Sequence, residues 1–339
     1  MIETSAIRLP NPERFMVTWD VGRRCNFDCS YCEVSRHDNV SRHHSYDELL
    51  STFEFIKQYT EGQEVNINFT GGEPTVNKAF WQLAEHIYNN ESRFRLSLTT
   101  NGAWHPSNTE RIAKWFKGIT VSYHAEGHTL LKNQTMTNIK LLNNIDIWLQ
   151  VNVMMHADHF EECKQVCEEL KNLNIKHNPR PIGDGTIERK GWFIDADGSS
   201  RRTSHEYNEE QKNWYLNHLG ISSPKEGRSC CGGRCLEGKV NGEWQKVSFI
   251  NTNFKGWYCS VDKYFMHIDQ HTGNVYHHQT CQALHNEKRG PIGTLENVNE
   301  ILDYKTANKD NIIICPNHRC GCGMCVPKAK SLNDFTFSQ

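Results

Sequence analysis

The sequence has no long apolar segment. None of its apolar runs approaches the roughly 18 residues that a membrane span requires, and residues 1–10 lack the apolar core of a signal peptide. A strong charge of either sign is also missing, because the formal net charge of the 339 residues is −2. We therefore expect a cytoplasmic protein with no membrane partner and no general nucleic-acid binding.

Cysteine, by contrast, is abundant, with 14 residues. In an intracellular chain of this length, cysteines are metal ligands more often than disulfide partners. A chain of this size can bury a large core, and we expect one large domain followed by a smaller one.

Three of these cysteines, Cys25, Cys29 and Cys32, form a tight trio. Iron–sulfur clusters usually take four Cys ligands, so three thiolates with no fourth cysteine nearby would leave one iron open. Structural zinc sites are closed and often use paired Cys-x-x-Cys units, which makes zinc the weaker interpretation. A redox cysteine set and a chance match also compete with the cluster interpretation.

The Cys-x3-Cys-x2-Cys spacing, with Tyr31 before the last cysteine, resembles the signature of the radical S-adenosylmethionine (SAM) superfamily. The resemblance implies that Cys25, Cys29 and Cys32 are the catalytic ligands of a 4Fe-4S cluster whose open iron is chelated by SAM, and that Tyr31 lies in the cofactor site. It also implies that an electron cleaves SAM to a 5′-deoxyadenosyl radical, which abstracts a substrate hydrogen atom. An external donor of the flavodoxin or ferredoxin type would supply that electron.

The hydrophobic pattern predicts strands that alternate with helices. Six strands are expected near residues 15–21, 65–69, 94–98, 119–123, 148–154 and 175–182. Capping boxes at Ser45–Glu48 and Ser107–Glu110 predict the start of two of the helices. This α/β order indicates a parallel sheet with helices outside and with its chemistry at the C-terminal strand ends. It resembles the partial (β/α)6 barrel of radical SAM enzymes.

Two motifs follow predicted strands. Gly71, Gly72 and Glu73 match the family's GGE motif, which the resemblance assigns to the amino group of SAM. Glycines let backbone approach a ligand closely, and a carboxylate can accept hydrogen bonds from an ammonium group. Thr100 and Asn101, with the glycine after them, resemble the Thr-Asn-Gly of a later strand end. An ordinary turn is the alternative for both motifs.

Further polar residues lie on the later predicted strands. By resemblance, Ser122 and Asn152 are candidates for binding the ribose and carboxylate of SAM. His124 ranks below them, because it could instead approach the substrate or be a buried core histidine. Cys163 and Cys167 are four residues apart on an apolar helix face, which favours core packing.

Residues 229–326 carry nine of the cysteines and resemble the small, Cys-rich α+β auxiliary domains called SPASM and twitch. The resemblance implies one or two auxiliary 4Fe-4S clusters. Cys259, Cys281, Cys322 and Cys325 are the preferred ligands of the first. Cys315 and Cys320 would then be spare, or would help to bind a second cluster. Zinc is the main alternative at this site.

The ligand spacing departs from the SPASM pattern at one point. Where that family has Gly-x4-Cys, this chain has His278 in the place of the cysteine, five residues after Gly273. Cys281 comes three residues after His278. We favour Cys281 over His278, because clusters are usually ligated by thiolates. Cys235, with the adjacent pair at 230–231, could supply a further ligand, a radical-quenching thiol or an ordinary turn.

The composition divides the chain into four parts. Residues 12–183 are predicted to form the barrel and 184–228 a connector or substrate-shaping insertion. Residues 229–326 are predicted to form the auxiliary domain, and 327–339 a polar tail that is partly ordered at best.

Family precedent for this domain pair favours modification of a peptide by crosslinking, epimerisation, oxidation or excision. Dehydrogenation or rearrangement of a small metabolite or nucleoside is the alternative substrate chemistry. An iron–sulfur electron carrier or sensor is the alternative of another class. The residues before the first predicted strand leave no room for a leader-binding domain, and a separate leader-peptide-binding protein could supply that function.

Overall fold

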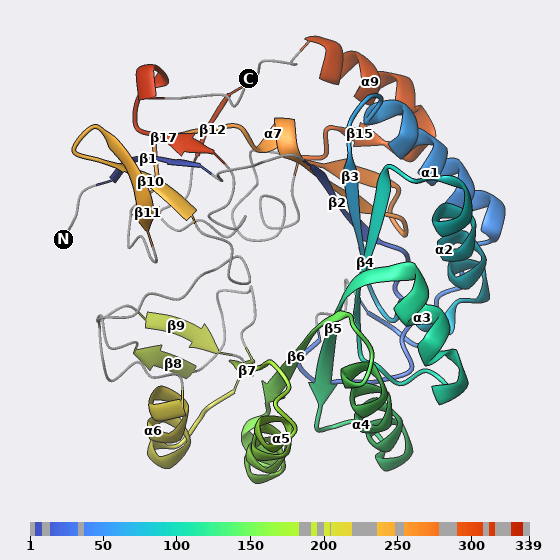
Figure 1. Ribbon diagram of the computed structural model, residues 1–339, viewed down its shortest axis with the longest axis vertical. Helices are drawn as coiled ribbons and strands as arrows, with labels where there is room; N and C mark the ends of the chain where they lie inside the picture. The colour runs from blue at the N-terminus through green and yellow to red at the C-terminus, as the bar shows by residue number, and fades with distance from the viewer. Residues whose placement is uncertain are drawn as a thin grey trace.

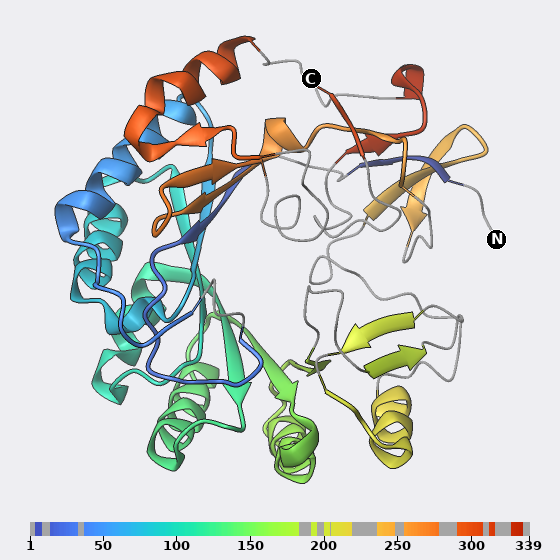
Figure 2. The ribbon, with the colours of Figure 1, turned by 180° about the vertical axis from the view of Figure 1, so that it is seen from behind.

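A computed structural model describes residues 4–8, 14–32, 37–182, 191–194, 200–203, 205–218, 236–247, 254–277, 290–307, 312–315 and 327–334. Strands of the largest sheet line the inside of an open arc, and helices cover its outside (Figures 1 and 2). None of the described helices is long and apolar enough to cross a membrane.

Six consecutive parallel strands form two thirds of the nine-stranded sheet and extend to one of its edges. They are β2 (Phe15–Asp20), β3 (Val65–Thr70), β4 (Phe94–Thr100), β5 (Phe116–His124), β6 (Trp148–Met155) and β7 (His177–Pro181). The helices between them are α1 (Tyr46–Tyr59), α2 (Lys78–Asn90), α3 (Thr109–Trp115), α4 (Thr129–Asn143) and α5 (Phe160–Asn172). This arrangement confirms the predicted α/β fold with a parallel sheet.

Alternation along the strands separates an apolar outer face from a polar inner face. Val65, Ile67 and Phe69 of β3 are fully buried in the core beneath the helices. Asn66 and Asn68, between them, are only partly buried on the opposite face. Closed barrels of this type usually fill their interior with branched apolar side chains, so this inner face is unusually polar.

A hairpin from the C-terminal half extends the same sheet. β13 (Phe265–Asp269) pairs in parallel with β2, and β14 (Asn274–Tyr276) and β15 (Gly293–Thr294) follow in antiparallel order. α9 (Val298–Ala307) packs near α1, with the Lys305 ammonium 4.8 Å from the centre of the Tyr59 ring. Part of the segment 229–326, which was predicted to form the auxiliary domain, therefore belongs to the barrel. β13 covers an edge of β2 that would otherwise be unpaired.

A second, six-stranded sheet pairs segments from near both ends of the described chain. Its members are β1 (Thr4–Arg8), β10 (Leu236–Val240), β11 (Glu243–Val247), β12 (Tyr258–Cys259), β16 (Ile313–Ile314) and β17 (Lys328–Ala329). β1 precedes the strand that was predicted to be first, and β17 lies within the predicted polar tail. Ala6 of β1 pairs with Ala329 of β17, and both are buried. Pairing between distant, short segments leaves little local signal in a sequence.

The predicted connector also contains regular structure. β8 (Gly191–Ile194) and β9 (Ser200–Thr203) form a two-stranded sheet, and α6 (Glu209–His218) follows. Short elements elsewhere are the helix α7 (Val261–Tyr264) and the 3₁₀ turns η1 (Pro74–Val76), η2 (Pro106–Asn108), η3 (Ala157–His159), η4 (Leu295–Asn297) and η5 (Leu332–Asp334).

One of the two predicted capping boxes is present. Ser45 accepts a hydrogen bond from the backbone N–H of Glu48, whose side chain accepts one from the Ser45 N–H. The prediction at Ser107 was wrong, because this residue lies inside η2 and α3 begins two residues later without a side-chain cap. His105 caps η2 instead, and its ring nitrogen accepts a hydrogen bond from the Ser107 N–H.

Candidate active site

The three-Cys loop leaves the C-terminal end of β2. Cys29 is buried, and Cys25 and Cys32 are half-buried. The Cys32 N–H donates to the Cys29 carbonyl over 3.0 Å, so the loop turns tightly. All three side chains pack around Phe27 and Ala103. The structure thus gathers the predicted trio at the strand ends.

Gly71 and Gly72 pack against the chain that leads into this loop. The Gly72 N–H donates to the Gly22 carbonyl over 2.8 Å. A Cβ on Gly72 would lie 2.2 Å from the Arg23 carbonyl oxygen, and one on Gly71 would lie 2.5 Å from the Gly22 oxygen. Gly71 also has a positive φ of 113°. Both positions therefore require glycine for contact with the loop.

Glu73 joins the ends of β3 and β4. Its carboxylate accepts hydrogen bonds from the Thr75 N–H and hydroxyl, the Thr100 hydroxyl and the Asn101 N–H, at 2.6–3.0 Å. The side chain is buried, and burial raises the pKa of the carboxyl group while these donors oppose the shift. Its predicted contact with the SAM amino group stays a prediction.

Asn101 connects the Thr-Asn-Gly motif to the loop. Its side-chain amide donates to the Asn26 side-chain oxygen over 2.6 Å and lies 3.8 Å from Cys25 Sγ. The Phe27 N–H also donates to Cys25 Sγ, over 3.4 Å. Burial raises the pKa of the Cys25 thiol to about 12, so a metal bound there must displace a proton. Hydrogen bonds to sulfur favour the thiolate that such a metal needs.

Tyr31 lies against the end of β5. Its hydroxyl is 2.5 Å from His124 Nδ1. Burial lowers the pKa of His124 to about 4, so the ring is neutral near pH 7, and burial raises the pKa of Tyr31, so the phenol keeps its proton. The phenol therefore donates to the imidazole. The sequence places His124 below Ser122 and Asn152 as a candidate, but in the structure it directly holds a loop residue.

Two functional candidates were missed. Glu126, just beyond β5, accepts two hydrogen bonds from Ser30, and His156, just beyond β6, lies beside it. Both follow the rule used for the other candidates, that polar residues after parallel strands meet at one edge. Because the rule applies equally to several neighbours, nothing in the sequence singles out these two.

Ser122 and Asn152 are paired in register on β5 and β6. The Asn152 side-chain oxygen accepts hydrogen bonds from Gln150 Nε2 and from Arg180 Nε, each over 3.1 Å. On the same face the Asn68 amide donates to the Thr99 hydroxyl over 3.4 Å. This side of the barrel can therefore bind a strongly polar molecule.

Cys163 and Cys167 lie in the core of the barrel. Both are fully buried on the inward face of α5, and the Cys163 thiol donates to the Met154 carbonyl over 3.3 Å. Core packing was the predicted role.

Of the predicted auxiliary ligands, the structure describes Cys259 and Cys315. Cys259 lies opposite Ile313, and the Cys315 N–H donates to the Trp257 carbonyl over 2.7 Å. Strand alternation puts both cysteines on the same side of this pair of strands. The remaining predicted ligands, Cys235, His278, Cys281, Cys320, Cys322 and Cys325, lie outside the described residues.

The donor set of the three-Cys loop fits a 4Fe-4S cluster. All three are free thiols on one loop. Within the described ranges, no three or more His, Cys, Asp or Glu side chains converge as ligands of a single ion. A cubane binds each thiolate at a different iron, so three free thiols on one loop can hold three of its irons.

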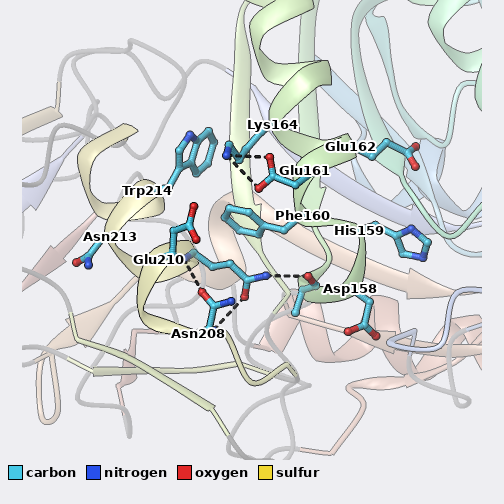
Figure 3. A pocket seen from close by; sticks show the side chains of 12 residues that line it. Asp158, His159, Phe160, Glu161, Glu162, Lys164, Asn208, Glu210, Asn213 and Trp214 are labelled. Atoms are coloured by element: carbon cyan, nitrogen blue, oxygen red, sulfur yellow. Dashed lines mark hydrogen bonds and ion pairs between the residues drawn. The ribbon is translucent and has the colours of Figure 1, made fainter.

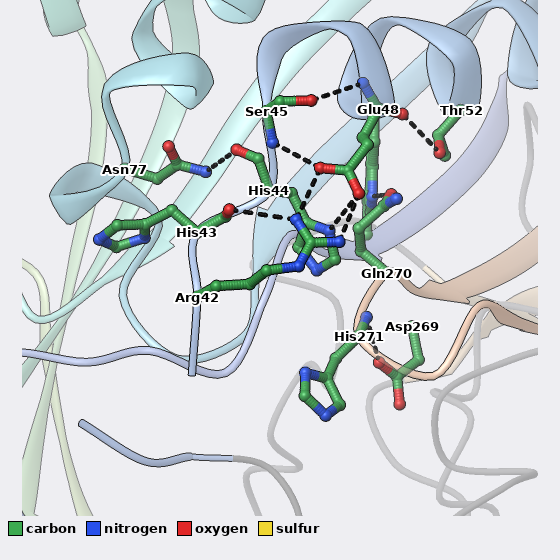
Figure 4. A network of polar contacts seen from close by, with 11 residues as sticks. Arg42, His43, His44, Ser45, Glu48, Thr52, Asn77, Asp269, Gln270 and His271 are labelled. Atoms are coloured by element: carbon green, nitrogen blue, oxygen red, sulfur yellow. Dashed lines mark hydrogen bonds and ion pairs between the residues drawn. The ribbon is translucent and has the colours of Figure 1, made fainter. Parts of the chain in front are cut away.

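A polar network anchors the chain beyond the loop (Figure 4). Arg42 makes two hydrogen bonds to the Glu48 carboxylate, at 2.5 and 2.8 Å. The Asn77 amide donates to the His44 carbonyl over 3.0 Å. These contacts fix the segment after the loop to the N-termini of α1 and α2.

A cleft of about 670 Å³ opens between α5 and α6 (Figure 3). Its walls include Trp214, Phe160, the acidic residues Asp158, Glu161 and Glu210, and Lys164. An adjoining groove of about 580 Å³ also reaches Trp214. A mainly acidic surface with an aromatic wall thus lies next to the end of β6.

Comparison with known proteins places this geometry in a family. Residues 19–185 match the family model described as the radical SAM superfamily. The chain is 35% identical over 98 residues to GTP 3′,8-cyclase of Haemophilus influenzae (strain PittEE), and this match covers 29% of this chain and 28% of that protein. It is 24% identical over 185 residues to the radical SAM cyclopropyl synthase TigE of Paramaledivibacter caminithermalis, which covers 46% and 38%. The chain thus spans well under half of these curated relatives.

Solved structures share the fold. The structure of anSMEcpe with bound AdoMet aligns with a TM-score of 0.51 at 15% identity, over 86% of this chain and 77% of that one. Streptococcus suis SuiB bound to precursor peptide SuiA aligns with a TM-score of 0.50 at 13% identity, over 84% and 64%. The family match, with the loop at the strand ends, identifies residues 19–185 as a domain of the radical SAM superfamily, and the curated relatives that the chain matches are enzymes.

Proposed function

We propose that the chain reductively cleaves SAM and uses the resulting radical to modify a peptide. The observation that carries this proposal is the direct contact of the Thr-Asn-Gly motif with the three-Cys loop, through Asn101, Asn26 and Cys25. An electron carrier needs the cysteines but has no use for a polar barrel interior beside them.

Different residues of the chain have different roles in this proposed reaction. Cys25, Cys29 and Cys32 would hold a 4Fe-4S cluster, and SAM bound at its open iron would supply a 5′-deoxyadenosyl radical for abstraction of a substrate hydrogen atom. Asn101 and the Phe27 N–H support Cys25. His124 holds Tyr31 at the edge of the site.

Gly71, Gly72, Glu73 and Thr100 keep the ends of β3 and β4 against the loop. We assign the SAM amino group to this edge. Ser122 and Asn152 on the inner face are assigned to the ribose and carboxylate, because their polar atoms lie on adjacent strands. Arg180 donates to Asn152 and adds positive charge to this part of the inner face.

A peptide substrate is supported by the surface outside the barrel. The cleft between α5 and α6 and its adjoining groove suit an extended chain better than a compact metabolite. SuiB and anSMEcpe, which share the fold, have been solved with the peptides SuiA and Cp18Cys. Cys259 in β12 and Cys315, directly after the neighbouring β16, support an auxiliary iron–sulfur site in the C-terminal part. A flavodoxin- or ferredoxin-type donor and a separate leader-peptide-binding protein complete the proposal.

A nucleotide is the second candidate substrate. The 98-residue match to GTP 3′,8-cyclase favours it, and the polar inner face could bind a nucleotide's hydrogen-bonding groups. The carboxylates that line the outer cleft do not help a phosphate, because like charges repel.

The test is SAM cleavage in the presence of fractionated host extract. Anaerobic, reconstituted enzyme with reductant is incubated with peptide fractions or small-molecule fractions, and 5′-deoxyadenosine is measured. Stimulation by a peptide fraction that is lost after protease treatment supports the proposal. Stimulation by the small-molecule fraction alone would favour the nucleotide, and no deoxyadenosine with any fraction would favour a carrier.

A further inference from the structure

Glu126 connects the three-Cys loop to the ends of two barrel strands. Ser30 lies between Cys29 and Cys32, and it donates twice to this carboxylate. Its N–H is 2.9 Å from Glu126 Oε2, and its hydroxyl is 2.7 Å from Oε1. His156, just after β6, brings Nε2 to 3.1 Å from the same Oε1. Ser30, by hydrogen bonds, and His156, by proximity, therefore approach one carboxylate from two directions.

The hydrogen bonds of His156 assign its proton. Nδ1 accepts a hydrogen bond from the Asp158 N–H over 3.2 Å, so in the neutral ring the proton lies on Nε2, on the Glu126 side. The side chain is only 4% exposed, and its ring centre is 4.1 Å from that of His205. Nε2 makes no well-directed hydrogen bond within the described part of the chain, so its effect on Glu126 is electrostatic. His156 is thus a fixed, buried support for the carboxylate.

The residue after Glu126 also contacts the loop. A Cβ on Gly127 would lie 1.9 Å from Cε1 of Phe27, so the Phe27 ring occupies the space of a side chain there. The same ring lies 5.7 Å from that of His124. The turn after β5 therefore contacts the loop at Phe27 and at Ser30, on both sides of Cys29.

Glu126 carries a negative charge in this position. Burial alone would raise the pKa of its carboxyl group, but hydrogen bonds from the Ser30 hydroxyl and N–H and the neighbouring His156 lower it below its usual value. Its side chain is 20% exposed, so water screens the charge only in part. Charge near an iron–sulfur cluster is one of the factors that set its reduction potential.

We propose that Glu126 is a positioning residue that fixes the spacing of Cys29 and Cys32 through Ser30 and lowers the reduction potential of the cluster they hold. The second half rests on the proposed function, because it requires a cluster at this loop. A negative carboxylate disfavours the added electron of the reduced state. Neither the GGE nor the Thr-Asn-Gly motif includes this residue.

The test compares Glu126→Gln with a matched control, Glu162→Gln. Glu162 is also a half-buried carboxylate near the end of β5, where it accepts hydrogen bonds from Tyr123 and Lys132 instead of from the loop. Hydrogen–deuterium exchange of the loop amides is measured in the full-length apoprotein. The midpoint potential of the reconstituted cluster is measured by EPR-monitored titration.

We expect E126Q to speed exchange at the Ser30 amide by about tenfold, since a charge-assisted hydrogen bond is lost, and to shift the midpoint potential to a more positive value. E162Q should match the wild type in both. An unchanged potential in E126Q would overturn the proposal whatever the exchange shows, because a merely structural role would also loosen the loop.

If E126Q does not fold, Ser30→Ala is the milder test. It removes one hydrogen bond and should speed exchange of the loop amides by about threefold; wild-type exchange would overturn the proposal. Failure of the proposed function gives a different result. In that case the wild-type protein would bind no cluster, or its cluster would not respond to SAM. The exchange measurements on apoprotein would be unaffected.

Discussion

Gly72 lies directly against the backbone carbonyl of Arg23. A Cβ at this position would be 2.2 Å from that oxygen and 2.4 Å from the Arg24 oxygen. Both are backbone atoms of the segment that carries Cys25, so neither can move without moving the loop. The GGE motif therefore supports the cluster loop in addition to any contact with SAM.

Gly72→Ala is expected to displace the loop. Forcing a methyl group into a packed contact costs typically about 1–3 kcal/mol, and the displaced cysteines should hold less iron after anaerobic reconstitution. Gly290→Ala is the control, because a Cβ there has no atom within 4 Å. Equal iron content and equal urea midpoints in the two variants would contradict this interpretation.

The chain order of the barrel could be predicted because its signals are local. Alternating apolar residues in β3, the Ser45 capping box and the spacing of the cysteines each lie within a short stretch of sequence. The parallel pairing of β13 with β2 could not be predicted, because it joins segments about 250 residues apart in a register set only by the fold.

The contacts within the candidate site could not be predicted from the sequence either. The sequence identified Glu73 and Asn101 as candidates through a family resemblance, yet their contacts with each other and with the loop appear only in the structure. Glu126 and His156 belong to no such motif. At Ser107 the local pattern misled, because a proline turn capped by His105 precedes the helix.

The capping box at α1 gives a stability prediction. Ser45→Ala removes the side-chain acceptor for the Glu48 N–H, which typically costs about 1 kcal/mol. Ser51→Ala, at an exposed position inside the same helix, should change stability by less than about 0.5 kcal/mol. Urea denaturation of the two variants tests the difference. Wild-type stability in S45A would show that the cap does not stabilise α1.

The buried imidazole of His124 predicts an acid-sensitive fold. Its pKa falls from 6.5 to about 4 in the folded protein because of burial. Below pH 6.5 the unfolded chain therefore binds a proton that the folded chain does not, so stability is lost as the pH falls from about 6.5 to about 4. His124→Gln should flatten this part of the profile, measured as urea midpoints of the apoprotein at pH 7 and pH 5. An unchanged slope would contradict the assignment.

Iron content tests the auxiliary site. If the wild type holds two 4Fe-4S clusters, it should contain about eight irons per chain after reconstitution. Cys259→Ala should lose about four of them and keep the response of the remaining cluster to SAM. Cys167→Ala, also buried but in the barrel core, should keep all eight. Full iron content in C259A would exclude Cys259 as an essential ligand.

The response of the reduced cluster to SAM tests the open iron itself. If Cys25, Cys29 and Cys32 hold a cubane with one iron free, SAM should change the EPR spectrum of the reduced, oxygen-free protein and yield methionine and 5′-deoxyadenosine. Cys29→Ala should abolish both effects. Zinc bound at these three cysteines, or a cluster spectrum that stays the same after SAM is added, would contradict an open iron at this loop.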